Sequence, residues 1–212
     1  MLQKSQQCHN LKGNTRRLLT GARLLSDIQI VDIASLAEAI RAIHEKYRIP
    51  HIVITSVKLV APDSHLSVVG SSMTSTGTPR IFKIVFPSID CFFSGTGDMF
   101  AAMMVIRMRE AAQQVPGLRE TPSWLSGDET ASLDLPLARA VEKVLASMHE
   151  VLSRTAAGMT SIIDRTVAGM SEEDKGNEKK MHLVKSKAAE VNIVRHLDCL
   201  RSPGRVFSAE TL

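Results

Sequence analysis

The sequence has few cysteines, few aromatic residues and no long apolar run. Its three cysteines, Cys8, Cys91 and Cys199, lie far apart and form no C-x-x-C pair, so neither a disulfide framework nor a zinc site is expected. Sparse cysteine is typical of a reducing compartment, which predicts a cytoplasmic protein. No apolar run reaches the length of a membrane span, so no membrane partner is expected. Aromatic side chains make up only 4% of the residues, which predicts an aliphatic, Met-rich core.

The chain also has little net charge along most of its length. The 212 residues carry a net charge of +4, and 26 basic side chains are mixed with 22 acidic ones. No basic stripe with interleaved aromatics is present, so no nucleic-acid partner is expected. The first 26 residues contain no acidic side chain, yet they also lack apolar periodicity. This predicts an irregular or disordered tail at 1–22, and it favours that interpretation over a mitochondrial presequence.

Helix and strand patterns alternate in the first half of the chain. The string Ser35-Leu36-Ala37-Glu38 fits a capping box, and apolar residues follow at helical spacing to position 47. Residues 51–55 form an apolar, β-branched run, which predicts a central strand buried on both faces. Two further strands, near 65–72 and 80–86, are predicted to form an antiparallel pair toward an edge of the sheet.

Two helices are predicted in the second half. Residues 99–106 are apolar nearly all round, which predicts a buried helix. Pro136 starts an amphipathic helix whose buried stripe is predicted to contain Leu137, Val141, Val144, Leu145, Met148, Val151 and Leu152. Residues 171–180 are dense in charge and are predicted to form a solvated loop. The alternation of strands and helices predicts an α/β fold with a mixed sheet flanked by helices.

The segment Gly95-Thr96-Gly97-Asp98 lies between a short apolar run and the predicted buried helix. Two glycines at the start of a helix let unpaired backbone N–H groups approach an anion closely. A carboxylate in the same turn can act as a general base on a nearby hydroxyl. A base beside an anion site is what phosphoryl transfer to an alcohol requires. Taken by itself, the string also fits a glycine-rich turn in which Asp98 caps the helix.

The surrounding residues distinguish these two interpretations. The stretch Phe93-Ser94-Gly95-Thr96-Gly97-Asp98-Met99-Phe100-Ala101-Ala102 closely resembles the signature of the pyridoxal kinases, a branch of the ribokinase-like superfamily. Residues 43–56, 68–71, 140–155 and 183–187 are similar to further segments of the same family. The resemblance implies a ribokinase-like sheet that is incomplete at the N-terminus. It also implies that residues 23–212 are the C-terminal part of the kinase domain.

The family resemblance implies ATP-dependent phosphorylation of the 5′-hydroxymethyl group of pyridoxal, and of pyridoxine and pyridoxamine, in pyridoxal 5′-phosphate salvage. Asp98 would be the catalytic base. The other implied site residues contact ATP: Gly95, Thr96 and Gly97 at the phosphates, Thr55 and Ser56 at the end of their strand, and Phe93 with Ile89 at the adenine. The family uses Mg²⁺ and a monovalent cation, although no metal-ligating residue is identified in this sequence. A homodimer is expected for the complete kinase.

The sequence departs from the family pattern in its first residues. The N-terminal strands that carry the pyridoxal contacts are not recognisable. Residues 14–23 offer no carboxylate where the family has a metal-organising stretch, and Arg23 stands where an acidic residue is usual. This leads us to expect slow turnover, if any, from the 212 residues alone. It also opens a second hypothesis, in which the chain is a catalytically inactive, kinase-derived fragment that acts only as a binding or regulatory partner.

Overall fold

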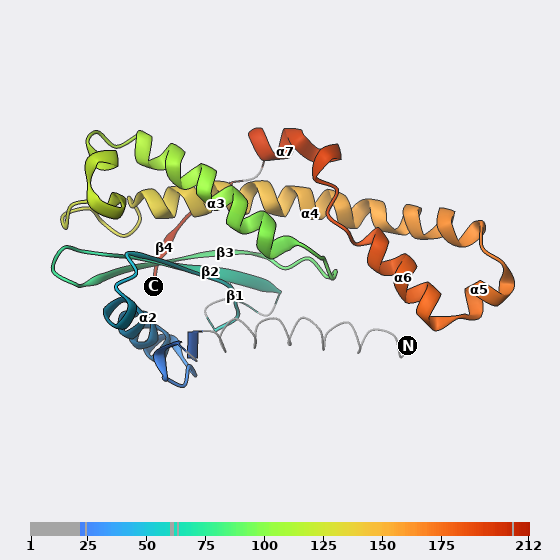
Figure 1. Cartoon of the computed structure of the whole chain (residues 1–212), viewed down its shortest axis with the longest axis horizontal. Coiled ribbons are helices and arrows are strands. Elements are labelled where there is room, and N and C mark those ends of the chain that lie inside the picture. The colour runs from blue at the N-terminus through green and yellow to red at the C-terminus, as the bar shows by residue number, and fades with distance from the viewer. Residues whose placement is uncertain (1–21, 24, 60–61, 63, 205) are drawn as a thin grey trace.

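The computed structural model describes residues 22–23, 25–59, 62, 64–204 and 206–212. The tail predicted for 1–22 lies outside these residues, except for Ala22, which is buried in the core beneath a helix. A four-stranded sheet forms the centre of the fold, with helices on both of its faces (Figure 1). The predicted α/β class, a sheet flanked by helices, is therefore confirmed.

The sheet contains β1 (His51–Val57), β2 (His65–Met73), β3 (Pro79–Pro87) and β4 (Glu210–Thr211), in the order β1-β2-β3-β4. All three pairings are antiparallel, so the mixed pairing that we predicted is not found in this four-stranded sheet. The antiparallel pairing predicted for β2 and β3 is confirmed. The central position predicted for β1 is wrong for the described sheet, because β1 pairs with β2 alone and forms one edge. Its side chains are mostly half-buried for the same reason.

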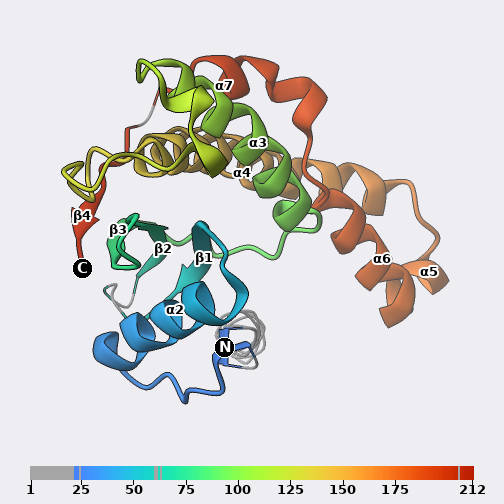
Figure 2. The same cartoon turned by 60° about the vertical axis from the view of Figure 1, so that its left-hand side comes forward.

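Helix α2 (Ile33–Tyr47) covers one face of the sheet, and α3 (Thr96–Gln113) and α4 (Pro136–Ala168) cover the other (Figure 2). The predicted stripe of α4 packs on the sheet and on α3, and all of it except the half-buried Leu152 is buried. On β3, Phe82 and Ile84 are completely buried under α4, and Phe86 packs beside them. The alternation of apolar residues in this strand therefore places one face in the core, as predicted.

The start of α2 differs from the prediction. Its N-cap is Asp32, whose carboxylate accepts a hydrogen bond of 2.8 Å from the backbone N–H of Ser35. The Ser35 hydroxyl in turn accepts from the Asp32 backbone N–H, at 3.0 Å. The capping box is thus formed by Asp32 and Ser35 instead of Ser35 and Glu38. Aspartate and serine are both strong N-terminal residues, and the helix gains almost a full turn from the earlier start.

Helix α3 is buried on one face only, which corrects the prediction of an all-round buried helix. Met99 and Met103 are buried against α4, whereas Val105 and Ile106 are 73% and 58% exposed. The reason is that α3 packs on α4 along a single face, and no described element covers the opposite one. An apolar composition therefore does not by itself guarantee burial at this position.

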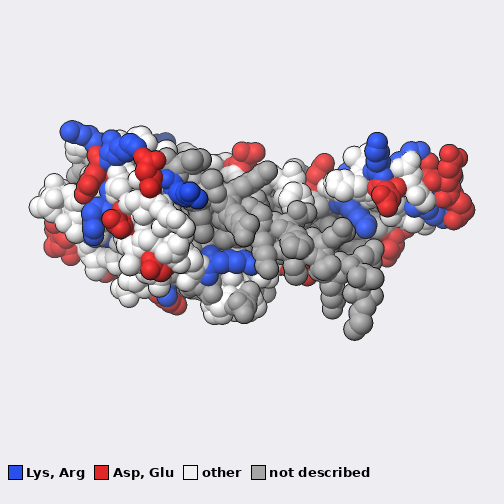
Figure 3. All heavy atoms as spheres, turned by 90° about the horizontal axis from the view of Figure 1, so that it is seen from below, with Lys and Arg blue, Asp and Glu red and all other residues white. Residues whose placement is uncertain are grey.

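The C-terminal quarter is more ordered than the sequence predicts. The segment 171–180, expected to be a loop, contains α5 (Glu172–Gly176) and the start of α6 (Glu178–Ala188). Salt bridges between Lys175 and Glu172 and between Lys180 and Asp174 lie in this region, where both signs of charge are mixed on the surface (Figure 3). The remaining helical elements are short. They are η1 (Leu118–Glu120) and η2 (Pro122–Trp124) between α3 and α4, and η3 (Ile193–His196) and α7 (Leu197–Arg201) after α6. No helix in the described part is long and apolar enough to cross a membrane.

Candidate active site

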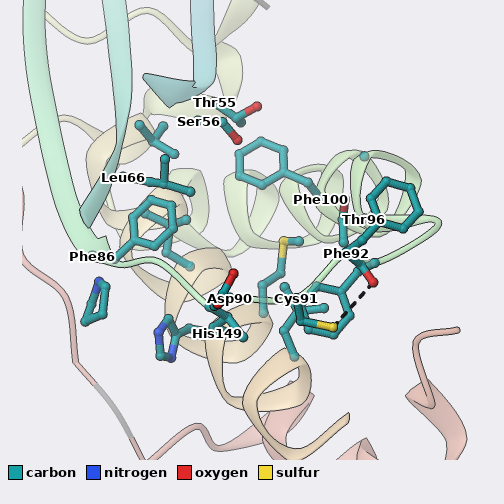
Figure 4. Close-up of a pocket in the computed structure, with 18 of the residues that line it drawn as sticks. Thr55, Ser56, Leu66, Phe86, Asp90, Cys91, Phe92, Thr96, Phe100 and His149 are labelled. Atoms are coloured by element: carbon teal, nitrogen blue, oxygen red, sulfur yellow. Dashed lines mark hydrogen bonds between the residues drawn. The ribbon is translucent and has the colours of Figure 1, made fainter. Parts of the chain in front are cut away.

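A cavity of about 710 Å³ opens between the sheet, the N-terminal end of α3 and the middle of α4 (Figure 4). Its walls come from the ends of β1 and β3, the β3–α3 loop, the first turns of α3 and one face of α4. Five of the predicted site residues line it together: Thr55, Ser56, Phe93, Thr96 and Gly97. The two others, Gly95 and Asp98, lie in the adjoining turn. The structure therefore brings residues that are 40 positions apart in the sequence to one site.

A β-bulge directs Thr55 and Ser56 into this cavity. Ile54 pairs with Val69 and Val57 pairs with Ser67, so two residues of β1 lie opposite the single residue Val68 of β2. In a regular strand, neighbouring side chains point to opposite faces, whereas a bulge allows both to serve the same site. Ser56 has a φ of 55°, a left-handed conformation that is costly for a residue with a side chain. Strain of this kind is concentrated at functional sites, which supports a ligand role for this bend.

The N-terminal end of α3 presents backbone donors to the same cavity. Gly95 is the N-cap, with a φ of 82° that favours glycine. Because glycine has no side chain to accept a hydrogen bond, the first amides of α3 have no N-cap acceptor. Thr96 and Gly97, which follow it, line the cavity. The partial positive charge of the helix end therefore adds to free N–H groups at the cavity wall, an arrangement that favours an anion.

Asp98 lies in the first turn of α3, and its side chain is exposed. It follows directly on the two residues that line the cavity, but it is not itself part of the lining. Its exposed carboxylate is accessible to a ligand next to the N-terminal end of α3. The catalytic role of Asp98 stays a prediction.

The apolar end of the cavity is built by side chains that sequence reasoning assigned to the core or did not single out. Leu145, Met148, His149 and Leu152 share one face of α4 and all line the cavity. Their spacing is that of a buried stripe, so periodicity alone cannot separate core from cavity wall. The lining also contains Phe86 and, as its acidic side chain, Asp90, which follows β3. Ile89 and Phe93, predicted near the adenine, are part of the same wall.

The described residues contain no group of three or more His, Cys, Asp or Glu side chains that could hold a metal ion. Mg²⁺ in phosphoryl-transfer sites is usually held by one or two carboxylates together with substrate phosphates, and it keeps several waters. Asp90 offers a carboxylate in the cavity wall to a magnesium ion that arrives with a nucleotide. It does not form a metal site by itself.

Comparison with known proteins finds relatives of one kind. Two proteins of Schizosaccharomyces pombe, both named as candidate pyridoxal kinases, match the sequence: one is 30% identical over 136 residues and the other 28% identical over 191 residues. These matches cover 64% and 89% of this chain but 39% and 51% of the two relatives, so the chain spans about half the length of the curated relatives that it matches. No protein-family model matches the chain.

The fold matches that of solved pyridoxal kinases. The pyridoxal kinase of Leishmania donovani in complex with ADP and pyridoxamine superimposes with a TM-score of 0.57 at 23% identity, over 90% of this chain and 48% of that one. The pyridoxal kinase of Trypanosoma brucei gives a TM-score of 0.58 at 19% identity. These similarities show a shared α/β fold. Together with the sequence relatives, they support a partial pyridoxal kinase, as the resemblance of residues 93–102 predicted.

Proposed function

We propose that the chain carries the nucleotide site and the catalytic base of an ATP-dependent pyridoxal kinase. The reaction is transfer of the γ-phosphoryl group of ATP to the 5′-hydroxymethyl of pyridoxal, pyridoxine or pyridoxamine. The observation that carries the proposal is the convergence of the β1 bulge and the uncapped start of α3 on one cavity. The Leishmania donovani kinase, which has the same fold, is described with ADP and pyridoxamine bound.

Different residues along the cavity bind the phosphates, hold the nucleotide and accept the proton. The amides at Gly95, Thr96 and Gly97 donate hydrogen bonds to the terminal phosphates and stabilise the charge that spreads over the transferring group. The hydroxyls of Thr55 and Ser56 hold the nucleotide from the opposite wall. Asp98 accepts the proton of the substrate hydroxyl as its oxygen attacks phosphorus, and ADP leaves along the cavity. The apolar end, which includes Ile89 and Phe93, receives the nucleobase.

Mg²⁺ would accompany ATP and neutralise charge on the β- and γ-phosphates, and Asp90, in the cavity wall, would be the carboxylate that approaches it. The family resemblance adds a monovalent cation, for which we propose no ligand. It also supports a role in vitamin B6 salvage and a homodimeric state for the whole enzyme, while the sparse cysteines favour a cytoplasmic location.

The test uses a protein extended at its N-terminus by the corresponding half of a pyridoxal kinase relative. It follows ATP-dependent formation of pyridoxal 5′-phosphate from pyridoxal by chromatography, with the affinity for ATP measured in parallel. Asp98→Ala and Asp98→Asn should each lower turnover by about 10²–10⁴-fold, the range for loss of a general base. Both should leave ATP affinity nearly unchanged, because the phosphate donors are backbone amides. Asp164→Ala, which removes an exposed carboxylate elsewhere on α4, is the matched control and should behave as wild type.

Two results would count against the proposal. Equal turnover in wild type and Asp98→Ala would exclude Asp98 as the base. An extended wild-type protein that binds ATP but phosphorylates none of the three vitamers would favour the inactive, kinase-derived binding partner instead.

A further inference from the structure

The C-terminal residues form a strap along α4. We define the C-terminal strap as residue 204 together with residues 206–212. Its first part is fixed by Glu150, whose Oε2 accepts a hydrogen bond of 2.7 Å from the backbone N–H of Gly204. Its later part is fixed by Glu142, whose Oε1 accepts one of 2.8 Å from the N–H of Ala209. The two glutamates lie on the same side of α4, roughly 12 Å apart along its axis.

Two further contacts hold the strap. It ends as β4, which pairs with β3 at Phe82 and Lys83, and the Lys83 ammonium lies 3.5 Å from the Glu210 carboxylate. Arg154 bridges Glu150 and Asp198, at 2.6 Å and 2.8 Å. The Gly204 amide and, to a smaller extent, the Arg154 guanidinium lower the pKa of Glu150, so this anchor stays ionised at neutral pH. The strap is therefore held at both of its ends.

Phe207 lies between the two glutamate anchors and contacts two aromatic rings of the cavity wall. Its ring centroid is 6.2 Å from that of Phe86, at an interplanar angle of 64°, and 5.4 Å from that of His149, at 65°. Both contacts have the edge-to-face geometry that aromatic pairs prefer. Phe86 and His149 line the cavity, whereas Phe207 does not, so Phe207 packs behind the wall. In Figure 4, Phe86 and His149 lie across the cavity from Thr96 at the start of α3.

We propose that Phe207 is a positioning residue that holds Phe86 and His149 in place to receive the nucleobase of ATP. The inference rests on the proposed function, because it needs the phosphates to bind at Thr96 and Gly97. The base then extends toward the apolar end of the cavity, where the two rings form part of the wall. A wall that is already ordered loses less entropy when it closes on a planar ligand. Without the Phe207 ring, both side chains can turn into the space that it leaves, and the base site loses its shape.

A positioning role for Phe207 predicts a ligand-dependent effect that general destabilisation of the fold would not give. A positioning residue at the base end affects ligands that carry a base, whereas a purely structural residue affects all ligands alike. Affinities of the intact chain for ATP and for inorganic tripolyphosphate, both measured by titration calorimetry, separate the two cases. Phe207→Ala should weaken ATP binding by about tenfold and leave tripolyphosphate binding within about twofold. Phe207→Leu, which keeps most of the apolar volume, should recover much of the ATP affinity.

The control is Val206→Ala, a neighbouring strap residue whose side chain is 85% exposed and which should not change either affinity. If Phe207→Ala does not unfold cooperatively, Phe207→Leu takes its place and should lose ATP affinity, by a few-fold, without losing tripolyphosphate affinity. Equal weakening of both ligands, or unchanged ATP binding by a folded Phe207 variant, would overturn the inference while leaving the proposed function intact. A wild-type chain that binds tripolyphosphate but gains nothing from the adenosine of ATP would overturn both.

Discussion

The imidazole of His44 and the hydroxyl of Ser71 share a hydrogen bond of 2.8 Å that joins α2 to β2 inside the protein. The other ring nitrogen, Nδ1, donates to the backbone carbonyl of Ile49. In the neutral ring, which burial favours, Nε2 therefore accepts from the Ser71 hydroxyl. The next residue, Ser72, makes the corresponding bond of 2.7 Å to His51, whose Nε2 donates to the carbonyl of Ser123. Two histidines are thus bonded to neighbouring serines of one strand.

Acid should destabilise the fold through these histidines. Burial lowers the pKa of both His44 and His51 below the ordinary value of 6.5. Below about pH 6.5 the unfolded chain therefore binds more protons than the folded one. The contribution of these histidines to the free energy of unfolding is fully present above that pH and is lost as the pH falls through the folded-state pKa. The loss should approach about 1.4 kcal/mol per pH unit for each histidine. Urea unfolding at several pH values measures it.

His44→Gln separates this titration from the rest of the acid response. The variant should be less stable than wild type by about 1–3 kcal/mol at pH 7, because the buried partners lose a well-placed bond. Its stability should also fall less steeply below pH 6.5. His182→Gln changes an exposed histidine and is the control, with the wild-type slope. A His44→Gln protein whose stability depends on pH as steeply as that of wild type would contradict the assignment.

Gly70 is required by the close packing of β2 on β3. A Cβ atom added at Gly70 would lie 2.2 Å from the Phe82 ring, which is itself completely buried. Gly70→Ala should therefore reduce the free energy of unfolding by about 1–3 kcal/mol through overpacking. Gly158→Ala is the matched control, because a Cβ at Gly158 meets nothing within 4 Å and the residue lies inside α4. That substitution should stabilise the protein by roughly 0.5–1 kcal/mol, and a shared sign for the two changes would refute the packing argument.

Arg80 fastens the β2–β3 turn to the segment before α4. Its guanidinium donates to the backbone carbonyls of Met73, Ser126, Gly127 and Thr130, at 2.8, 3.3, 2.7 and 3.1 Å. Arg80→Ala should cost about 2–3 kcal/mol in thermal or urea unfolding, since bonds from a charged donor are lost. Arg119→Ala, at an exposed arginine, should cost less than about 0.5 kcal/mol. A cost as small for Arg80 as for Arg119 would show that the turn is held by other contacts.

The sequence predicts the elements of this fold better than it predicts their partners. The β-branched run at 51–55 and the alternation of Phe82, Ile84 and Phe86 identify strands, because each signal is contained in a few neighbouring residues. The edge position of β1 depends on which strands pair with it, and that information is spread over the whole chain. The charge-dense segment 171–180 lacks an apolar stripe, so periodicity does not reveal its helices, which local capping by Ser171 and Asn177 supports.

The same distinction applies to the site. The residues Gly95 to Asp98 were identified because a contiguous string carries their chemistry. The bulge that turns Thr55 and Ser56 toward the cavity is visible only once β1 is paired with β2. Phe207 contacts His149 across 58 positions of sequence, a relationship that no local pattern contains. Sequence reasoning therefore singled out the start of α3, which borders the cavity, but could not assemble the apolar end.

Gly97 provides the most direct test of the claim that this cavity binds ATP through the start of α3. A Cβ atom there would meet no atom within 4 Å, and the residue lines the cavity, so Gly97→Val should leave the fold intact and fill the space into which the phosphates must come. The measurement is ATP affinity by titration calorimetry, beside the melting temperature of the same proteins. We predict that wild type binds ATP and that Gly97→Val binds it at least tenfold more weakly, with a melting temperature within a few degrees of wild type. Undiminished ATP binding by Gly97→Val would contradict the account.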